Sequence, residues 1–209
     1  MEAQPGRGRL ITLEGPDGAG KTVVGQRLAT ALVARGRSVV LTREPGGTRL
    51  GERLRGLLLE DRGRIEPWAD ALLFNAARAE LVAEILEPAL AAGQVVVCAR
   101  YTDSTLAYQG YGAGLSLDRL RSLAEIATGG LVPDRTVVLD IDPVQGLRRK
   151  AGSEQTRFEA SFDLDFHRRV RAGFLALAAA EPDRFRVVDA SRGVDSVYAD
   201  VEAAALEVV

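Results

Sequence analysis

The stretch RLITLEGPDGAGKT, residues 9–22, runs from a short apolar segment into a glycine-rich turn. It fits the pattern G-x-x-x-x-G-K-[ST] at every fixed position, and a helical pattern, TVVGQRLATALVARG, follows it. The glycines permit a turn whose backbone N–H groups point inward, and the N-terminus of the next helix adds partial positive charge. The stretch therefore predicts a loop that binds the phosphates of a nucleoside triphosphate, made of Gly15, Pro16, Asp17, Gly18, Ala19, Gly20, Lys21 and Thr22.

Two side chains of this phosphate loop have expected roles of their own. Lys21 brings a full positive charge to the β- and γ-phosphates, and the hydroxyl of Thr22 is expected to bind Mg²⁺. The motif predicts that ATP binds, but it leaves open which group receives the γ-phosphate.

Further apolar runs alternate with helical periodicity along the rest of the chain. With residues 9–14, the expected strands are 38–42, 94–98, 136–141 and 185–189. Continuously apolar strands are typical of a parallel sheet with helices on both faces, so we expect an α/β fold with five parallel strands. The expected helices are 20–35, 48–60, 67–92, 116–128, 143–151, 160–181 and 194–207. In the longest of them, one apolar stripe is expected from Leu72, Ala76, Ala79, Ala83, Leu86 and Leu90.

Length and composition limit the remaining possibilities. The 209 residues fit a single domain, 1–209, with residues 1–8 expected to be flexible. A net charge of -2 gives no overall attraction to nucleic acid or to an anionic membrane, so phosphate binding has to be local. We expect a cytoplasmic protein, because there is no secretion signal and no apolar run of the ~18 residues that a membrane span needs.

Four more segments contribute to the expected site. They are TREPGGT (42–48), LLFNAAR (72–78), ARYTDSTLAYQG (99–110), which we expect to be a polar loop after the third strand, and RRKAGSEQTRFE (148–159). Together with the phosphate loop, these segments resemble the bacterial thymidylate kinases, P-loop nucleoside monophosphate kinases that transfer the γ-phosphate of ATP to dTMP in dTTP biosynthesis. REPGGT and LAYQG are specific to that family. The resemblance implies the strand order 2-3-1-4-5 and a homodimer with the 67–92 helix at its interface.

The resemblance also implies how dTMP is bound. Arg100 and Arg55 hold the acceptor phosphate, a task suited to a planar guanidinium that makes parallel charge-assisted hydrogen bonds. Phe74 stacks on thymine, and Arg78, four residues further along the same helical face, reaches a base carbonyl.

Four more residues complete the acceptor side in this family. Tyr108 lies beneath the sugar, where its bulk disfavours a ribose 2′-hydroxyl, while Ser104 and Gln109 line the base pocket. Glu44 organises the acceptor and the metal-bound waters.

The segment 148–159 is rich in arginine and suits a lid that closes over the triphosphate. Closure is expected to bring Arg149 or Arg157 to the charge on the transferring phosphoryl group. By resemblance, Asp17 faces the 3′-hydroxyl and the region of phosphate transfer. The expected catalytic set is Lys21, Arg100, Arg149, Arg157 and Asp17.

One position departs from the family. Thymidylate kinases usually read Asp-Arg-Tyr or Asp-Arg-His where this chain has Ala99-Arg100-Tyr101. An alanine side chain cannot help to hold a metal, and the other nearby carboxylates that could order metal-bound water are Glu14 and Asp103. We therefore expect both nucleotides to bind but turnover to be reduced.

Two alternative functions stay open from the sequence. One is a P-loop switch or regulator that binds ATP without kinase turnover, which the alanine at position 99 favours. The other is a kinase of a different nucleoside monophosphate, against which REPGGT and LAYQG argue.

Overall fold

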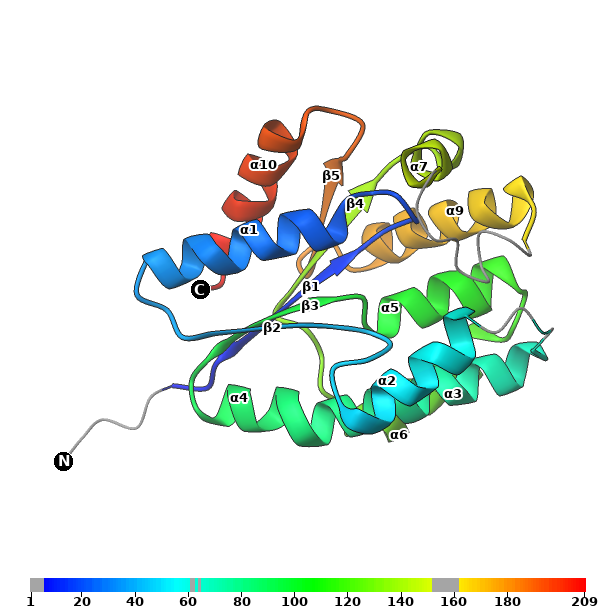
Figure 1. The fold of residues 1–209 in the computed structure, drawn as a ribbon, viewed down its shortest axis with the longest axis horizontal. Helices are drawn as coiled ribbons and strands as arrows, with labels where there is room; N and C mark the ends of the chain where they lie inside the picture. The colour runs from blue at the N-terminus through cyan, green and yellow to red at the C-terminus, as the bar shows by residue number, and fades with distance from the viewer. Residues whose placement is uncertain (1–5, 61–62, 64, 152–161) are drawn as a thin grey trace.

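The protein, seen here as a computed structural model, is described for residues 6–60, 63, 65–151 and 162–209 (Figure 1). Its five strands form one parallel sheet in the order β2-β3-β1-β4-β5, which confirms the predicted architecture. The strands are β1 (Arg9–Glu14), β2 (Val39–Arg43), β3 (Val95–Ala99), β4 (Arg135–Asp140) and β5 (Phe185–Asp189). Because all pairs are parallel, the five carboxyl ends meet at one edge, where open α/β sheets bind their ligands.

Helices cover both faces of this sheet (Figure 1). On one face lie α1 (Lys21–Ala34) and α10 (Val194–Leu206), which contact each other. The helices of the other side and of the sheet edge are α2 (Arg49–Arg55), α3 (Pro67–Leu81), α4 (Glu87–Ala91), α5 (Thr102–Thr105), α6 (Leu117–Thr128), α7 (Pro143–Lys150) and α9 (Leu164–Ala180). Three segments are π-helical, namely η1 (Gly56–Glu60), η2 (Val82–Leu86) and η3 (Leu106–Gly112).

The strands are apolar on both sides because both sides are packed. In β1, Ile11 and Leu13 join the core beneath α1 and α10, whereas Leu10 points to the opposite face and packs near α4. Packing on both faces explains why residues 10–14 of this central strand are all buried. No helix of the described residues is both long enough and apolar enough to cross a membrane.

The long helix predicted at 67–92 is present, but its apolar stripe was predicted wrongly. Leu72, Ala76 and Ala83 are exposed, whereas Leu86 and Leu90 are buried. The chain passes from α3 through the π-helical turn η2 into α4, and a π turn inserts a residue into the helical repeat. Positions spaced at three and four residues therefore do not stay on one face along the whole segment.

The segment after β3 was also predicted wrongly, because it is helical rather than a loop. Residues 102–112 form α5 and η3, and nearly all of them are buried. Their polar side chains are bonded inside the protein: Asp103 accepts from Arg184, and Gln109 donates to Asp70. Partners so distant in sequence make a polar segment compatible with burial, and a local pattern does not reveal them.

Candidate active site

The phosphate loop connects β1 to α1, and its glycines have conformations that other residues rarely adopt. Gly18 has φ of +77°, and a Cβ at this position would overlap the backbone carbonyl of Gly146 in α7. Gly20 is the N-cap of α1 with φ of 91°, and no side chain caps this helix. The N–H groups of its first turn are therefore available to an anion, as in other phosphate-binding helix N-termini.

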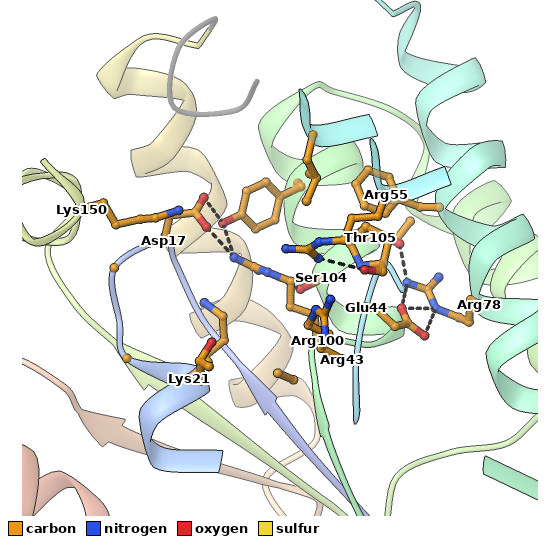
Figure 2. A pocket seen from close by; sticks show the side chains of 18 of the residues that line it. Asp17, Lys21, Arg43, Glu44, Arg55, Arg78, Arg100, Ser104, Thr105 and Lys150 are labelled. Atoms are coloured by element: carbon orange, nitrogen blue, oxygen red, sulfur yellow. Dashed lines mark hydrogen bonds and ion pairs between the residues drawn. The ribbon is translucent and has the colours of Figure 1, made fainter. Parts of the chain in front are cut away.

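One cleft of about 330 Å³ joins this loop to the rest of the expected site (Figure 2). The phosphate loop contributes Asp17, Gly18, Gly20, Lys21 and Thr22 to its lining. All eight residues expected to bind dTMP line the same cleft, namely Glu44, Arg55, Phe74, Arg78, Arg100, Ser104, Tyr108 and Gln109. Figure 2 shows Arg100 between Asp17 of the phosphate loop and the Glu44–Arg78 pair across the cleft.

Gly15, Pro16 and Ala19 of the phosphate loop do not line the cleft, but they support the residues that do. Lys21 Nζ donates to the carbonyl oxygens of Gly15 at 2.8 Å and Pro16 at 2.7 Å, so the lysine folds back over its own loop. Ala19 is buried in the core beneath α1. A small apolar residue at that position lets the loop pack against the sheet.

Arg100 is at the centre of the polar contacts. Its Nη2 donates to Asp17 Oδ1 at 2.7 Å and to the Tyr108 hydroxyl at 3.1 Å, while its Nη1 donates to Ser104 Oγ at 3.1 Å and to the Gly15 carbonyl at 3.3 Å. The Tyr108 hydroxyl in turn donates to Asp17 Oδ2 at 2.8 Å. One arginine thus connects the phosphate loop to the α5–η3 segment.

Arg78 borders the cleft but is only 1% exposed. Its Nε donates to Glu44 at 2.9 Å, and Nη2 donates to the Tyr101 carbonyl and the Thr105 hydroxyl, each at 3.0 Å. A buried guanidinium requires such partners, because an unpaired buried charge is strongly unfavourable. The helical spacing of Phe74 and Arg78 did not predict this ion pair, because Glu44 follows β2 and is not on the same helix.

The other acceptor-side residues are held by local contacts. Arg55 ends α2 and donates to the Pro45 carbonyl at 2.9 Å. Gln109 Nε2 donates to Asp70 Oδ2 at 2.8 Å, so its amide orientation is set by an acidic residue of α3 that the sequence reasoning missed.

The lid residues have mixed outcomes. Arg149 lies in α7, lines the cleft and donates to the carbonyls of Ala190 at 2.8 Å and Ser191 at 3.2 Å, so it is bonded to the turn that follows β5. Arg157 lies outside the described residues. Lys150 also lines the cleft and was missed, although it directly follows Arg149 in the sequence.

Neither candidate replacement for the carboxylate at position 99 is open to the cleft. Asp103 is bonded to Arg184 Nη1 at 2.7 Å on the other side of α5, which overturns its expected part in ordering metal-bound water. Glu14 is fully buried and accepts from the Tyr101 N–H at 2.7 Å and the Ser104 hydroxyl at 2.6 Å. Ala99 itself lines the cleft.

Burial and neighbouring charges shift the pKa values of two residues in the site. Burial, together with the nearby charge of Arg100, lowers the pKa of Lys21 from 10.5 to about 7, against the opposing carboxylates of Asp17 and Glu14. For Asp17, burial alone would raise the pKa, but the charges of Arg100, Lys21 and Lys150 bring it to about 2. The site therefore holds excess positive potential that an anionic ligand would satisfy.

A phosphate loop that shares one cleft with several arginines, at the carboxyl edge of a 2-3-1-4-5 sheet, is the arrangement of a P-loop nucleoside monophosphate kinase. The sequence model of the family described as thymidylate kinase matches residues 13–201. The chain belongs to the thymidylate kinase family, and it catalyses the ATP-dependent phosphorylation of dTMP to dTDP.

Individual relatives agree with this assignment. A thymidylate kinase of Deinococcus radiodurans is 53% identical over 201 residues, covering 96% of this chain and 98% of the relative. One from Solidesulfovibrio magneticus is 52% identical and covers 90% of this chain and 94% of its own. The crystal structure of thymidylate kinase from Ehrlichia chaffeensis superposes with a TM-score of 0.77 at 35% identity, covering 94% of this chain and 97% of that one. These similarities confirm the dTMP kinase prediction.

The lowered pKa of Lys21 predicts proton uptake when ATP binds. At pH 8 an ammonium with a pKa of about 7 is mostly neutral, and the triphosphate restores its charge, so binding takes up close to one proton. At pH 6 the lysine is already charged, so the proton uptake on ATP binding falls towards zero. Calorimetry of ATP binding in buffers of different ionisation enthalpy measures the number of protons taken up per ATP. Lys21→Met is the control, because it removes the group that takes up the proton. A binding enthalpy independent of the buffer at pH 8 would contradict the prediction.

Proposed function

We propose that ATP and dTMP occupy this one cleft with their phosphates facing each other, and that Asp17, Lys21 and Arg100 surround the transferred phosphoryl group. The observation that carries the proposal is that the phosphate loop and all eight expected acceptor residues line the same space. Phosphoryl transfer depends mainly on positioning and on stabilising charge, and the arrangement supplies both without a dedicated base.

On the donor side, the N-terminus of α1 and Lys21 bind the β- and γ-phosphates, and Arg149 adds charge from α7. The Thr22 hydroxyl, a hard oxygen donor at the start of α1 and in the cleft lining, fits Mg²⁺, which usually takes one or two protein oxygens beside phosphates and waters. When bound, Mg²⁺ supplies charge that offsets the phosphate oxygens. The proposed role of Arg157 in the lid stays a prediction from the sequence.

On the acceptor side, Arg100 and Arg55 bind the phosphate of dTMP, and Phe74 stacks on its base. The four Nη contacts of Arg100 are all made to neutral or acidic protein groups. A phosphate dianion can replace some of them, because charge-assisted pairs are the stronger bonds. Tyr108 excludes a ribose 2′-hydroxyl, Ser104 and Gln109 line the base pocket, and Arg78 reaches the base from its pair with Glu44, which organises the acceptor.

Removing the guanidinium of Arg100 tests this acceptor assignment. Arg100→Met is expected to weaken dTMP binding about 10- to 100-fold, the usual worth of hydrogen bonds between charged groups. Binding of thymidine, which lacks the phosphate, is expected to change little. Calorimetry with both ligands measures the difference, and equal weakening of the two would show that Arg100 does not bind the phosphate.

We propose further that Ala99 lowers turnover. The acidic residues in the cleft lining are Asp17 and Glu44, and each is already paired, with Arg100 at 2.7 Å and with Arg78 at 2.8 Å. No group of three or more metal-binding side chains occurs among the residues that the structure describes. The carboxylate that other thymidylate kinases carry at position 99 therefore has no free substitute in the described cleft lining.

Restoring that carboxylate gives a direct test. Ala99→Asp is expected to raise kcat about tenfold, equivalent to ~1.4 kcal/mol of transition-state stabilisation, and to lower the Mg²⁺ concentration for half-maximal rate. Ala99→Asn, which has the same size without the charge, is the matched control. Equal dTDP formation by the wild type and Ala99→Asp at every Mg²⁺ concentration would remove the proposal.

We also propose that the enzyme acts as a homodimer in the cytoplasm, as the resemblance to bacterial thymidylate kinases implies. Support comes from the exposed apolar side of α3 and η2, where Leu72, Ala76 and Ala83 lie. Small and apolar side chains on an outer helical face are suited to contact between two copies.

Leu72→Glu is expected to convert the dimer into monomers, because it buries charge at the proposed contact. Val33→Glu is the control, since Val33 is similarly exposed at 58% but lies on α1. Sedimentation at micromolar concentration gives the mass of each form. A wild type that sediments as a monomer would refute the proposed assembly.

A further inference from the structure

Glu14 is the last residue of β1 and directly precedes the phosphate loop, yet it does not line the cleft. It is 0% exposed. Oε1 accepts from the backbone N–H of Tyr101 at 2.7 Å, and Oε2 accepts from the hydroxyl of Ser104 at 2.6 Å. Both donors belong to the segment that follows β3 and carries Arg100.

The backbone around Arg100 is fixed by the end of β1. Arg100 has φ of +69°, and it is the one non-glycine residue with positive φ among the described residues. Its own N–H donates to the Leu13 carbonyl at 2.9 Å, and the next N–H, that of Tyr101, donates to Glu14. Because residues other than glycine favour negative φ, these neighbouring bonds keep Arg100 in a conformation that it would otherwise leave.

The side chain of Arg100 is directed by the same carboxylate. Ser104 donates its only hydroxyl proton to Glu14, so the Ser104 oxygen can act only as an acceptor towards its other neighbour. That neighbour is Arg100 Nη1, which donates to Ser104 Oγ at 3.1 Å. The charge state of Glu14 therefore decides whether Ser104 accepts from the guanidinium or competes with it as a donor.

We propose that Glu14 is a positioning residue for dTMP phosphorylation, which aims the Arg100 guanidinium at the acceptor phosphate through the Tyr101 N–H and the Ser104 hydroxyl. The inference rests on the proposed role of Arg100 in binding that phosphate. A buried carboxylate is costly unless it is hydrogen-bonded, and both oxygens of Glu14 are bonded to the segment that carries Arg100.

The environment of Glu14 supports this account. Burial, together with the nearby negative charge of Asp103, raises the pKa of Glu14 to about 7, against the Ser104 bond and the charge of Arg100. Lys21 and Arg78 also interact electrostatically with this carboxylate from the phosphate loop and from α3. The fold keeps a costly buried carboxyl where it contacts the segment of the acceptor-binding arginine.

Glu14→Gln is the variant that separates positioning from packing. The Tyr101 N–H and the Ser104 hydroxyl donate to different oxygens of Glu14, so an amide of the same shape turns a donating NH2 group towards one of these two donors. We expect dTMP binding to weaken about tenfold, while thymidine binding and the KM for ATP stay within about twofold. Thermal melting checks that the variant is folded. Glu14→Asp, which keeps the charge but shortens the reach, is expected to give the same phosphate-specific loss and serves if Glu14→Gln does not fold.

A double-mutant cycle with Arg100→Met decides whether Glu14 acts through Arg100. We expect the double variant Glu14→Gln/Arg100→Met to bind dTMP no more weakly than Arg100→Met alone. Additive losses, or unchanged dTMP binding in both Glu14 variants while Arg100→Met binds weakly, would overturn the positioning role alone. Unchanged dTMP binding in Arg100→Met would overturn the assignment of Arg100, and the role of Glu14 with it.

Discussion

The parallel pairing of β1 with β3 is the constraint on which the site depends. In this register Leu13 lies opposite Ala99, so the chain leaves both strands at the same level of the sheet. The phosphate loop begins one residue after Glu14, and Arg100 begins the segment on the neighbouring strand. A shift of the register would separate the donor loop from the acceptor-binding segment, and the apolar residues on both faces of β1 oppose such a shift.

The cationic side chains of the site are held by contacts within the protein. Arg100 pairs with Asp17, Arg78 pairs with Glu44, and Lys21 bonds to backbone carbonyls of its own loop. These contacts hold cationic groups in the cleft where we propose that the phosphates bind. Because these side chains are already ordered, ligand binding costs them less conformational entropy than it would cost a flexible surface.

Much of this arrangement could be predicted from the sequence. Strand positions followed from continuous apolar runs, and the phosphate loop followed from a motif whose glycines are required by backbone geometry, as the φ of Gly18 illustrates. The acceptor residues depended on the resemblance to a known family. Their gathering in one cleft follows from parallel strands, whose carboxyl ends meet at one edge.

The missed features depend on contacts between distant parts of the chain. The burial of Asp103 requires Arg184, which is 81 residues away, and that of Arg78 requires Glu44, 34 residues away. The π turn at η2 changed the phase of the long helix, although no residue there marks an interruption by itself. Periodicity describes regular helices and local partners, so it predicts neither effect.

The hydrogen bond from the Tyr108 hydroxyl to Asp17 joins η3 to the phosphate loop. This bond limits which substitutions the sequence can accept during evolution. Asp17, Arg100 and Tyr108 each contact the other two, so replacing any one removes a hydrogen-bond partner from both of the others. Drift at these three positions is expected to proceed by joint replacement, with single intermediates eliminated by selection, even though 83 residues of chain separate the first from the second.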